Sequence, residues 1–159
     1  PAPTEEVGSV SVMGDSVMAM VVPEVQAFGG GVDAVKSRQF REIVDLTLAH
    51  RDSGALGHTV VVHGGTNGPI EEKDLRRLLE GLGDRRVYLV NVKAPVAWEG
   101  FNNELVPRIA GEYPHVRVID WYSAASAHPE WLYDDGVHPR PGEGAAGLAN
   151  LIWTSIQPG

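Results

Sequence analysis

A serine follows an apolar segment near the start of the chain, in the tetrapeptide GDSV (14–17). Serine and aspartate at such a position are good helix caps, which is a purely structural role. A serine at a strand-to-helix turn is also exposed at the edge of a sheet, where its hydroxyl can act as a nucleophile. Taken alone, Ser16 is better explained as a cap, so the chemical interpretation depends on other segments of the chain.

A candidate partner for this hydroxyl lies in the late loop YDDGVHPRPGEG (133–144), where two residues separate Asp135 from His138. A turn of that length allows the carboxylate to reach Nδ1 of the imidazole and leaves Nε2 free to face a third group. A general base for a hydroxyl nucleophile requires this arrangement, because the carboxylate fixes the tautomer and stabilises the imidazolium. We therefore predict a triad of Ser16, His138 and Asp135, although such a pair is also common as a simple loop hydrogen bond.

A nucleophilic serine also needs hydrogen-bond donors for the negative charge of a tetrahedral intermediate. One candidate donor is the backbone N–H of Ser16, at a helix start. Another is the side-chain amide of Asn67 in the glycine-flanked turn GGTNG (64–68). An Asn before Gly is by itself an ordinary left-handed turn residue. The occurrence of all three turns in one chain is much less expected by chance than any single one, and it favours the chemical interpretation.

Metal and sugar contacts are supported by fewer residues. His58 and His63 are five residues apart on one predicted strand, so they point to opposite faces and we expect no shared metal ion. The chain has no cysteine, which excludes disulfides and thiolate zinc sites. Trp98 and Trp131 lie in loops near the proposed site and could stack on a sugar, although large aromatic residues more often fill cores.

The length and charge of the chain limit its organisation and partners. A chain of 159 residues suits one domain with a buried core. The formal net charge of −8 argues against nucleic acid or anionic lipid as the main partner, because both bind clustered Lys and Arg. The opening segment PAPTEE (1–6) is typical of the end of a linker. We therefore predict a linker remnant over 1–6 and a single domain over 7–159.

Apolar runs alternate with amphipathic stretches along the chain. The apolar runs predict strands at 7–13, 58–65, 86–92 and 116–120, with a further short strand in VDAVK (32–36). The amphipathic stretches predict helices at 16–28, 38–50, about 75–82, 101–113 and 142–156. Proline cannot donate a backbone hydrogen bond, so we expect Pro23 to disturb the first helix.

This alternation implies right-handed crossovers and a parallel sheet that is covered on both faces. The nearly continuous apolar character of the strands agrees, since sheets buried on both faces lose polar alternation. We predict an α/β fold, a three-layer α/β/α sandwich with a parallel sheet of about five strands, flavodoxin-like in style. Ligands of such folds bind beyond the carboxyl ends of the strands, where Ser16 and the GGTNG turn would meet.

Several segments together resemble a known group of proteins. GDSV (14–17), GTNG (65–68) and DGVHP (135–139) resemble signature blocks of the SGNH (GDSL-like) hydrolase superfamily. VDAVKSRQF (32–40) and VIDWYSAASAHPEW (118–131) are similar to one branch, the extracytoplasmic C-terminal domains of bacterial peptidoglycan O-acetyltransferases. The resemblance covers residues 10–156, and several blocks in order with matching spacers are far more specific than any one block.

The resemblance implies a role for each candidate residue. Ser16 would be the nucleophile, His138 the base and acid, Asp135 its orienting partner, and Asn67 an oxyanion donor. The second family block normally supplies a glycine whose N–H completes the oxyanion hole. This chain has no glycine in AVKSRQ (34–39), and Ser37 is the aligned candidate. The residues expected to contact substrate are Asp15, Trp98 and Trp131.

The resemblance also implies a reaction and a cellular setting. An acetyl group would pass through an acyl-Ser16 intermediate to a carbohydrate hydroxyl, the muramoyl C6 hydroxyl of peptidoglycan, without a cofactor. A membrane acyltransferase domain fused to this one would deliver the acetyl groups to the extracytoplasmic face of the bacterial membrane. Two alternatives stay open: a carbohydrate or lipid O-acetyl esterase with the same triad, and a non-catalytic glycan-binding module. An ordinary α/β-hydrolase is disfavoured, because the chain contains no GxSxG.

Overall fold

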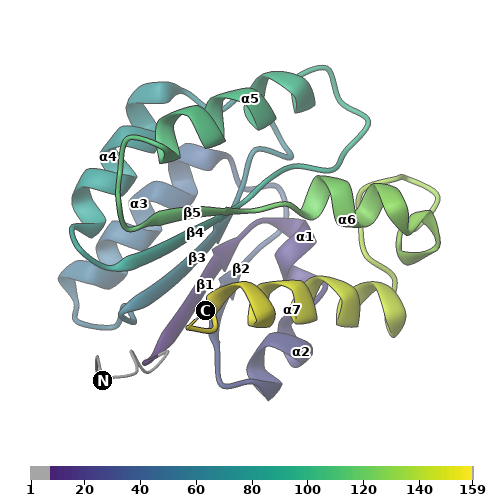
Figure 1. Cartoon of the computed structure of the whole chain (residues 1–159), viewed down its shortest axis with the longest axis horizontal. Helices are drawn as coiled ribbons and strands as arrows, with labels where there is room; N and C mark the ends of the chain where they lie inside the picture. Colours follow the sequence, from purple (N-terminus) through teal and green to yellow (C-terminus); the bar gives the residue numbers. More distant parts are fainter. Residues whose placement is uncertain (1–7, 159) are drawn as a thin grey trace.

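The computed structural model of the chain describes residues 8–158, which form one parallel sheet with helices on both faces (Figure 1). The five strands lie in the order β2-β1-β3-β4-β5, and each neighbouring pair is parallel. Their bounds are Val10–Gly14 for β1, Gly31–Ala34 for β2, Thr59–His63 for β3, Arg86–Val90 for β4 and Val116–Ile119 for β5. This order is the flavodoxin-like one, so the predicted fold class is confirmed.

Helices cover both faces of the sheet. Their bounds are Ser16–Ala19 for α1, Val22–Ala27 for α2, Phe40–Asp52 for α3, Glu72–Leu82 for α4, Glu99–Ala110 for α5, Trp121–Ala127 for α6 and Glu143–Ile156 for α7, with a 3-10 turn η1 at Pro129–Trp131. α3, α4 and α5 lie on one side of the sheet, whereas α1, α2 and α7 lie on the other (Figure 1). Within residues 8–158, no helix has the length and hydropathy needed to span a bilayer.

The strands are apolar because both faces are buried. In β3, Val61 packs into the core beneath α7, while Val60 and Val62 pack into the core beneath α3, α4 and α5. Successive side chains of a strand point to opposite faces, so one run of valines supplies both cores. All five residues of β3 are buried, and this central strand therefore holds the turn that follows it in a fixed position.

The first predicted helix is two helices. α1 ends at Ala19 and α2 begins at Val22, so the interruption between the two helices lies before Pro23 rather than at it. Pro23 lies in the first turn of α2, where a missing backbone N–H costs no helical hydrogen bond. The predicted linker at 1–6 and the predicted strand start at residue 7 lie outside the described residues.

The segment between β5 and α7 contains structure that the sequence analysis treated as a loop. α6 begins directly after Asp120, whose carboxylate accepts the N–H of Ser123 at 3.1 Å and caps the helix. Trp121, the first residue of α6, is fully buried. α6 (Figure 1) is followed by η1. The loop after η1 carries Asp135 and His138.

Candidate active site

Ser16 is the first residue of α1 and lies just beyond the carboxyl end of β1. The carboxylate of Asp15 accepts the N–H of Val17 at 3.0 Å, so Asp15 rather than Ser16 caps the helix. Gly14 allows this sharp turn, because a Cβ there would overlap the side chain of Met18. The hydroxyl of Ser16 is therefore not used as the helix cap.

His138 joins the hydroxyl of Ser16 to the carboxylate of Asp135. Its Nε2 lies 2.9 Å from Ser16 Oγ, and its Nδ1 lies 2.6 Å from Asp135 Oδ2. An ionised carboxylate can only accept a hydrogen bond, so Nδ1–H donates to Asp135. In the neutral ring this leaves Nε2 to accept a hydrogen bond from the Ser16 hydroxyl. The geometry permits proton transfer from Ser16 Oγ to His138, and it matches the predicted grouping of these three residues.

The loop itself fixes the carboxylate of Asp135. Its second oxygen, Oδ1, accepts the backbone N–H groups of Val137 at 2.9 Å and His138 at 3.1 Å. Gly136 has a φ of +70°, the left-handed conformation that this tight turn requires. Partial burial by itself would raise the pKa of Asp135, but the hydrogen bonds from the His138 ring and the two N–H groups outweigh it and lower the pKa. Asp135 is thus ionised at neutral pH.

The predicted oxyanion donor Asn67 has its side-chain amide held in place. Its Nδ2 donates to the main-chain carbonyl of Arg38 at 3.0 Å. The main-chain carbonyl of Asn67 accepts from Gln39 Nε2 at 3.1 Å, which also holds the turn. A primary amide carries two N–H groups, so one hydrogen can orient the group while the other serves a ligand. Because a carbonyl oxygen can only accept a hydrogen bond, the side-chain atom of Asn67 that faces Arg38 is the amide nitrogen.

The turn that carries Asn67 is held from α5 by a residue that the sequence analysis did not single out. The side chain of Asn102 is fully buried and makes three hydrogen bonds to this turn. It accepts from the N–H of Ile70 at 2.8 Å and donates to the carbonyls of Gly65 at 2.9 Å and Gly68 at 3.1 Å. The sequence did indicate that Asn102 is buried, because it lies on the same helical face as the apolar residues Leu105, Val106 and Ile109.

Ser37 is the residue that the resemblance aligns with the glycine of the second family block. Its φ is +67°, in the left-handed region that glycine favours. Among residues 8–158, every other residue with a positive φ is a glycine. Its side chain is exposed, in the loop between β2 and α3. The backbone at Ser37 thus keeps the conformation expected of a glycine although the residue differs.

Asp15 cannot contact a substrate in the way we predicted. Its side chain is completely buried, and its Oδ1 lies 3.3 Å from Nδ1 of the equally buried His63 at the end of β3. Burial by itself would raise the pKa of Asp15, but attraction to His63 and the N–H of Val17 outweigh it and lower the pKa. Asp15 therefore supports the turn beneath Ser16 instead of facing outward.

The two predicted aromatic contacts differ. Trp131 stacks on His128 at 4.1 Å and on Trp121 at 6.1 Å between ring centroids, and its ring also fills the space beside Gly147 of α7. These contacts make Trp131 a packing residue of the α6–η1–α7 region. Trp98 is half-buried and donates its indole N–H to the carbonyl of Thr66 at 3.1 Å, so it lies beside the Asn67 turn.

No group of metal ligands was found in the part of the chain that the structure describes. Among residues 8–158, no three His, Asp or Glu side chains converge as they would around a metal ion. His58 is exposed and lies just before β3, whereas His63 is the last residue of β3 and is buried beside Asp15. The side chains gathered at this edge are the hydroxyl of Ser16, the imidazole of His138, the carboxylate of Asp135 and the amide of Asn67.

Similarity searches relate this chain to bacterial acetyltransferases. The O-acetyltransferase OatA of Staphylococcus aureus is 32% identical over 153 residues, which cover 91% of this chain and 24% of the relative. The peptidoglycan O-acetyltransferase OatA of Listeria monocytogenes is 31% identical over 128 residues, which cover 79% of this chain and 20% of the relative. The chain thus spans about a quarter or less of the length of these relatives. No family model matches the chain.

Solved structures share the fold. The C-terminal catalytic domain of peptidoglycan O-acetyltransferase A (OatA) from Streptococcus pneumoniae superposes with a TM-score of 0.82 at 22% identity, covering 93% of this chain and 92% of that chain. A GDSL-like lipase from Bacteroides thetaiotaomicron gives 0.68 at 20% identity, covering 98% and 91%. A carbohydrate esterase of family 3 from Talaromyces cellulolyticus gives 0.65 at 17% identity, covering 93% and 95%. The likeness at these identities is one of fold.

Proposed function

This chain is homologous to bacterial peptidoglycan O-acetyltransferases and shares its fold with GDSL-type hydrolases, and we propose that it is a serine-dependent O-acetyltransferase domain. It would move an acetyl group through an acyl-Ser16 intermediate to a carbohydrate hydroxyl, namely the muramoyl C6 hydroxyl of peptidoglycan. The observation that carries this proposal is the 2.9 Å contact between Ser16 Oγ and His138 Nε2. That contact joins residues 122 positions apart, so local chain geometry does not account for it.

The first step acetylates the enzyme. Ser16 Oγ attacks the carbonyl carbon of the acetyl donor while its proton passes to His138 Nε2, and the former carbonyl oxygen takes up negative charge. Asp135 remains ionised and stabilises the imidazolium through Nδ1–H. The tetrahedral intermediate then collapses, and the departing group of the donor takes the proton from Nε2. The products are acetyl-Ser16 and the released carrier.

The negative oxygen needs donors that are already in place. We assign this role to the N–H of Ser16, the second amide hydrogen of Asn67 and the N–H of Ser37. Preorganised donors of this kind contribute about 10²–10³ each to turnover, because no solvent has to reorganise during the reaction. The left-handed φ of Ser37 and the fixed amide of Asn67 support this assignment.

The second step reverses the proton transfers with a different nucleophile. His138 Nε2 takes the proton of a sugar hydroxyl as that hydroxyl attacks acetyl-Ser16, and it returns the proton to Ser16 Oγ when the intermediate collapses. Trp98 is the remaining aromatic candidate for contact with the sugar, because it lies beside the Asn67 turn. The product is an O-acetyl sugar and free Ser16.

The cellular setting is part of the same proposal. Peptidoglycan as the acceptor requires the domain to act on the extracytoplasmic side of the bacterial membrane. Acetyl groups would then have to cross the membrane, and a fused membrane acyltransferase domain would supply them. The relatives are about four times as long as the matched region, which leaves room in them for such a domain.

Substitution of the proposed nucleophile tests the reaction. We expect Ser16→Ala to lower acetyl transfer from p-nitrophenyl acetate to chito- or muropeptide oligomers by roughly 10⁴–10⁶-fold, as for other nucleophile deletions. Ser155→Ala is the matched control, because its hydroxyl bonds the Leu151 carbonyl at 2.6 Å within α7, away from the site. Mass spectrometry of the oligomers measures the transfer. Turnover by Ser16→Ala near the parent rate would rule out the proposed mechanism.

Hydrolysis is the second candidate function, and the fold shared with a GDSL-like lipase and a carbohydrate esterase favours it. The two reactions differ only in whether a sugar hydroxyl or water attacks acetyl-Ser16. Competition between the acceptors on a chromogenic acetyl ester distinguishes them. Product partitioning to sugar supports transfer, whereas release of acetate alone at saturating sugar supports the esterase.

A non-catalytic glycan-binding module would keep the fold without the reaction. A serine-directed organophosphonate separates this alternative from both enzymes, because covalent labelling requires a hydroxyl activated by a base. We expect one adduct, located at Ser16 by peptide mass spectrometry and absent from Ser16→Ala. A folded protein without any adduct would indicate the binding module.

A further inference from the structure

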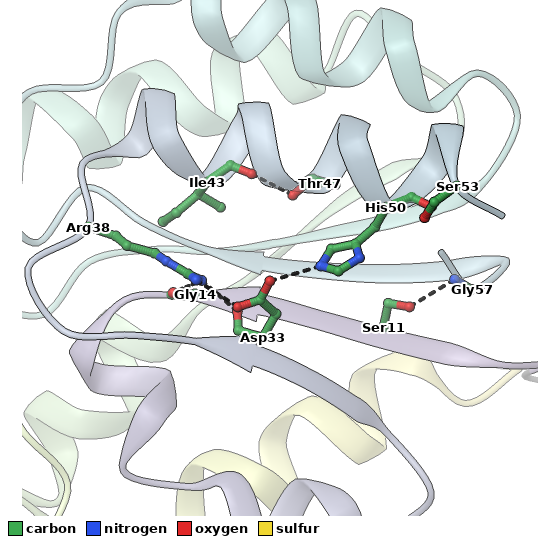
Figure 2. Close-up of polar contacts among 9 residues, drawn as sticks. All are labelled: Ser11, Gly14, Asp33, Arg38, Ile43, Thr47, His50, Ser53 and Gly57. Carbon is green, nitrogen blue, oxygen red and sulfur yellow. Dashed lines mark hydrogen bonds and ion pairs between the residues drawn. The ribbon is translucent and has the colours of Figure 1, made fainter. Parts of the chain in front are cut away.

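An ion-pair cluster lies between the edge strand β2 and helix α3 (Figure 2). Its members are Asp33 on β2, His50 on α3 and Arg38 in the loop that joins them. Arg38 Nη2 donates to Asp33 Oδ1 at 2.7 Å, and His50 Nε2 lies 2.8 Å from the other carboxylate oxygen, Oδ2. Both oxygens of Asp33 are thus engaged, one by each neighbour, and the orientation of the carboxylate is fixed.

The guanidinium of Arg38 also reaches the main chain of two strands. Its Nη1 donates to the carbonyl of Asp33 at 3.0 Å and to the carbonyl of Gly14 at 3.4 Å. Gly14 is the last residue of β1 and precedes Asp15 and Ser16. Figure 2 shows the guanidinium extending from the loop toward Gly14 and Asp33. Arg38 therefore links its own loop to the ends of β1 and β2.

The main chain of Arg38 touches the candidate oxyanion site directly. Its carbonyl accepts the amide N–H of Asn67 at 3.0 Å, the bond that orients that side chain. The residue before it, Ser37, has the left-handed φ of +67° and carries the other candidate donor of this loop. The side chain of Arg38 holds this backbone segment in place, and the carbonyl of the segment in turn orients the Asn67 amide.

The electrostatics of the cluster favour a rigid arrangement. The side chain of Arg38 is only 12% exposed and that of Asp33 is 29% exposed, so solvent screens their attraction incompletely. Partial burial by itself would raise the pKa of Asp33, but the hydrogen bonds from His50 and Arg38 outweigh it and lower the pKa. A charge-assisted bond between a planar guanidinium and a carboxylate also has a defined geometry, which a flexible ammonium does not provide.

We propose that Arg38 is a positioning residue for the oxyanion hole. Through its side-chain bonds to Asp33 and Gly14 it fixes its own backbone, whose carbonyl orients the Asn67 amide. Asp33 holds the guanidinium through Oδ1, and His50 holds the carboxylate of Asp33 through Oδ2. Arg38 does not touch the reacting atoms, and the inference rests on the proposed function of Ser16 and Asn67.

Single substitutions test the effect on turnover. We expect Arg38→Met to lower kcat for p-nitrophenyl acetate by about 30–100-fold with KM within about threefold, since a misplaced donor loses most of its 10²–10³-fold contribution. Arg38→Lys retains the charge but not the planar fork, and we expect a loss of only about 5–10-fold. Arg77→Met is the matched control, because Arg77 pairs with Asp45 at 2.6 Å on the exposed surface of α3 and α4.

A double-mutant cycle with Asn67→Ala distinguishes positioning from general support of the fold. A residue that acts through Asn67 has nothing left to position once the amide is removed. We therefore expect the combined loss of kcat in Arg38→Met/Asn67→Ala to be at least about tenfold smaller than the product of the single losses. Thermal unfolding of each variant is measured in parallel. If Arg38→Met does not fold, the cycle is run with Arg38→Lys, and the loss in Arg38→Lys/Asn67→Ala should equal that of Asn67→Ala alone within about twofold.

The outcomes separate this inference from the proposed function. Multiplicative losses, or an Arg38→Met variant with parental kcat, overturn the positioning role while Ser16→Ala stays inactive and the proposed function stands. An active Ser16→Ala variant overturns the proposed function and this inference with it. A strong coupling between Arg38 and Asn67, with unchanged Arg77→Met, supports both.

Discussion

His138 uses its two ring nitrogens differently, and the difference comes from its neighbours. Nδ1 faces an ionised carboxylate at 2.6 Å and must donate, so Nε2 is available to accept from Ser16 at 2.9 Å. Asp15, only one residue from Ser16, has a carboxylate of the same kind but turns inward, toward His63. The spacing of Asp135 and His138 was sufficient to predict their contact. The inward turn of Asp15 was not predictable, because its sequence neighbours do not show which side of β1 is packed.

Removal of the charge on Asp135 tests its orienting role. Asn in its place can present either an oxygen or an amide nitrogen to Nδ1, and the amide nitrogen would favour the tautomer that protonates Nε2 and blocks proton transfer. We expect Asp135→Asn to lower kcat by about 10²–10⁴-fold with little change in KM, measured by steady-state hydrolysis of a chromogenic acetyl ester.

The neighbouring residue supplies the control for this change. Asp134 is fully exposed and its carboxylate lies 3.2 Å from Arg140 Nη2, outside the site. We expect Asp134→Asn to retain the parental kcat, since exposed ion pairs contribute little. Equal losses in the two variants would mean that the charge of the loop, and not the contact with His138, is what matters.

The elements that position the site differ in how well the sequence revealed them. β1, β3, β4 and β5 were predicted within a few residues, because their apolar runs are set by burial on both faces. The short helix α6 was missed, because the two large residues of WYSAASA, Trp121 and Tyr122, are adjacent and the segment has no amphipathic repeat. The sequence feature that indicates α6 is the capping residue Asp120, and a search for apolar periodicity does not detect helix caps.

The loop that carries Asp135 and His138 is closed at its base by contacts between η1 and the segment that leads into α7. The carbonyl of Trp131 accepts the N–H of Arg140 at 2.6 Å, and Leu132 forms an isolated antiparallel bridge with Pro139. Gly144, in the first turn of α7, lies directly against the Trp131 carbonyl, where a Cβ would overlap it. The position of His138 thus depends on close packing between η1 and the first turn of α7.

A methyl group at Gly144 tests this dependence. We expect Gly144→Ala to lower the free energy of unfolding by about 1–3 kcal/mol, because the overlapped atom is a backbone carbonyl that cannot rotate away. Turnover should fall as well, since displacement of η1 moves the loop that carries His138. Urea unfolding and ester hydrolysis measure the two effects.

Gly100 provides a control with the same chemical change in a helix. A Cβ there has no atom within 4 Å, and the position lies in the first turn of α5. Gly100→Ala should be neutral or more stable by up to about 1 kcal/mol, from helix propensity alone. Destabilisation of both variants to the same extent would show that helix position, and not the contact with Trp131, determines the result.

At the scale of the whole molecule, the parallel topology brings the site together. Ser16 follows β1, the turn of Asn67 follows β3, and the loop of His138 follows β5 and α6, so all three lie at the carboxyl edge. This convergence could be predicted from the alternation of strands and helices. The supporting contacts of Arg38 and Asn102 could not, because they depend on side-chain packing between segments about 30 to 40 residues apart.

The stability of the whole fold at low pH depends on the contacts of several carboxylates together. Five carboxylates among the described residues have a lowered pKa: Asp15, Asp33, Asp120, Glu130 and Asp135. A group with a lower pKa in the folded state binds more protons when unfolded, so its stabilisation is full above the unfolded pKa of about 3.9 and is lost as pH falls further. We expect the free energy of unfolding to decline from about pH 5 downward in urea titrations.

The variant Asp33→Asn isolates one of these contributions from all the others. At pH 7 the change should cost roughly 1–3 kcal/mol, because Arg38 loses a charged acceptor. The protonated carboxyl of the parent is also uncharged, so the difference between parent and variant should shrink as pH falls from about 4 toward 2. Parallel urea titrations of the two proteins measure this difference directly. If it stays constant across that range, the pair of Arg38 and Asp33 does not stabilise the fold through its charge, and the support that we infer for the oxyanion loop would have to come from shape alone.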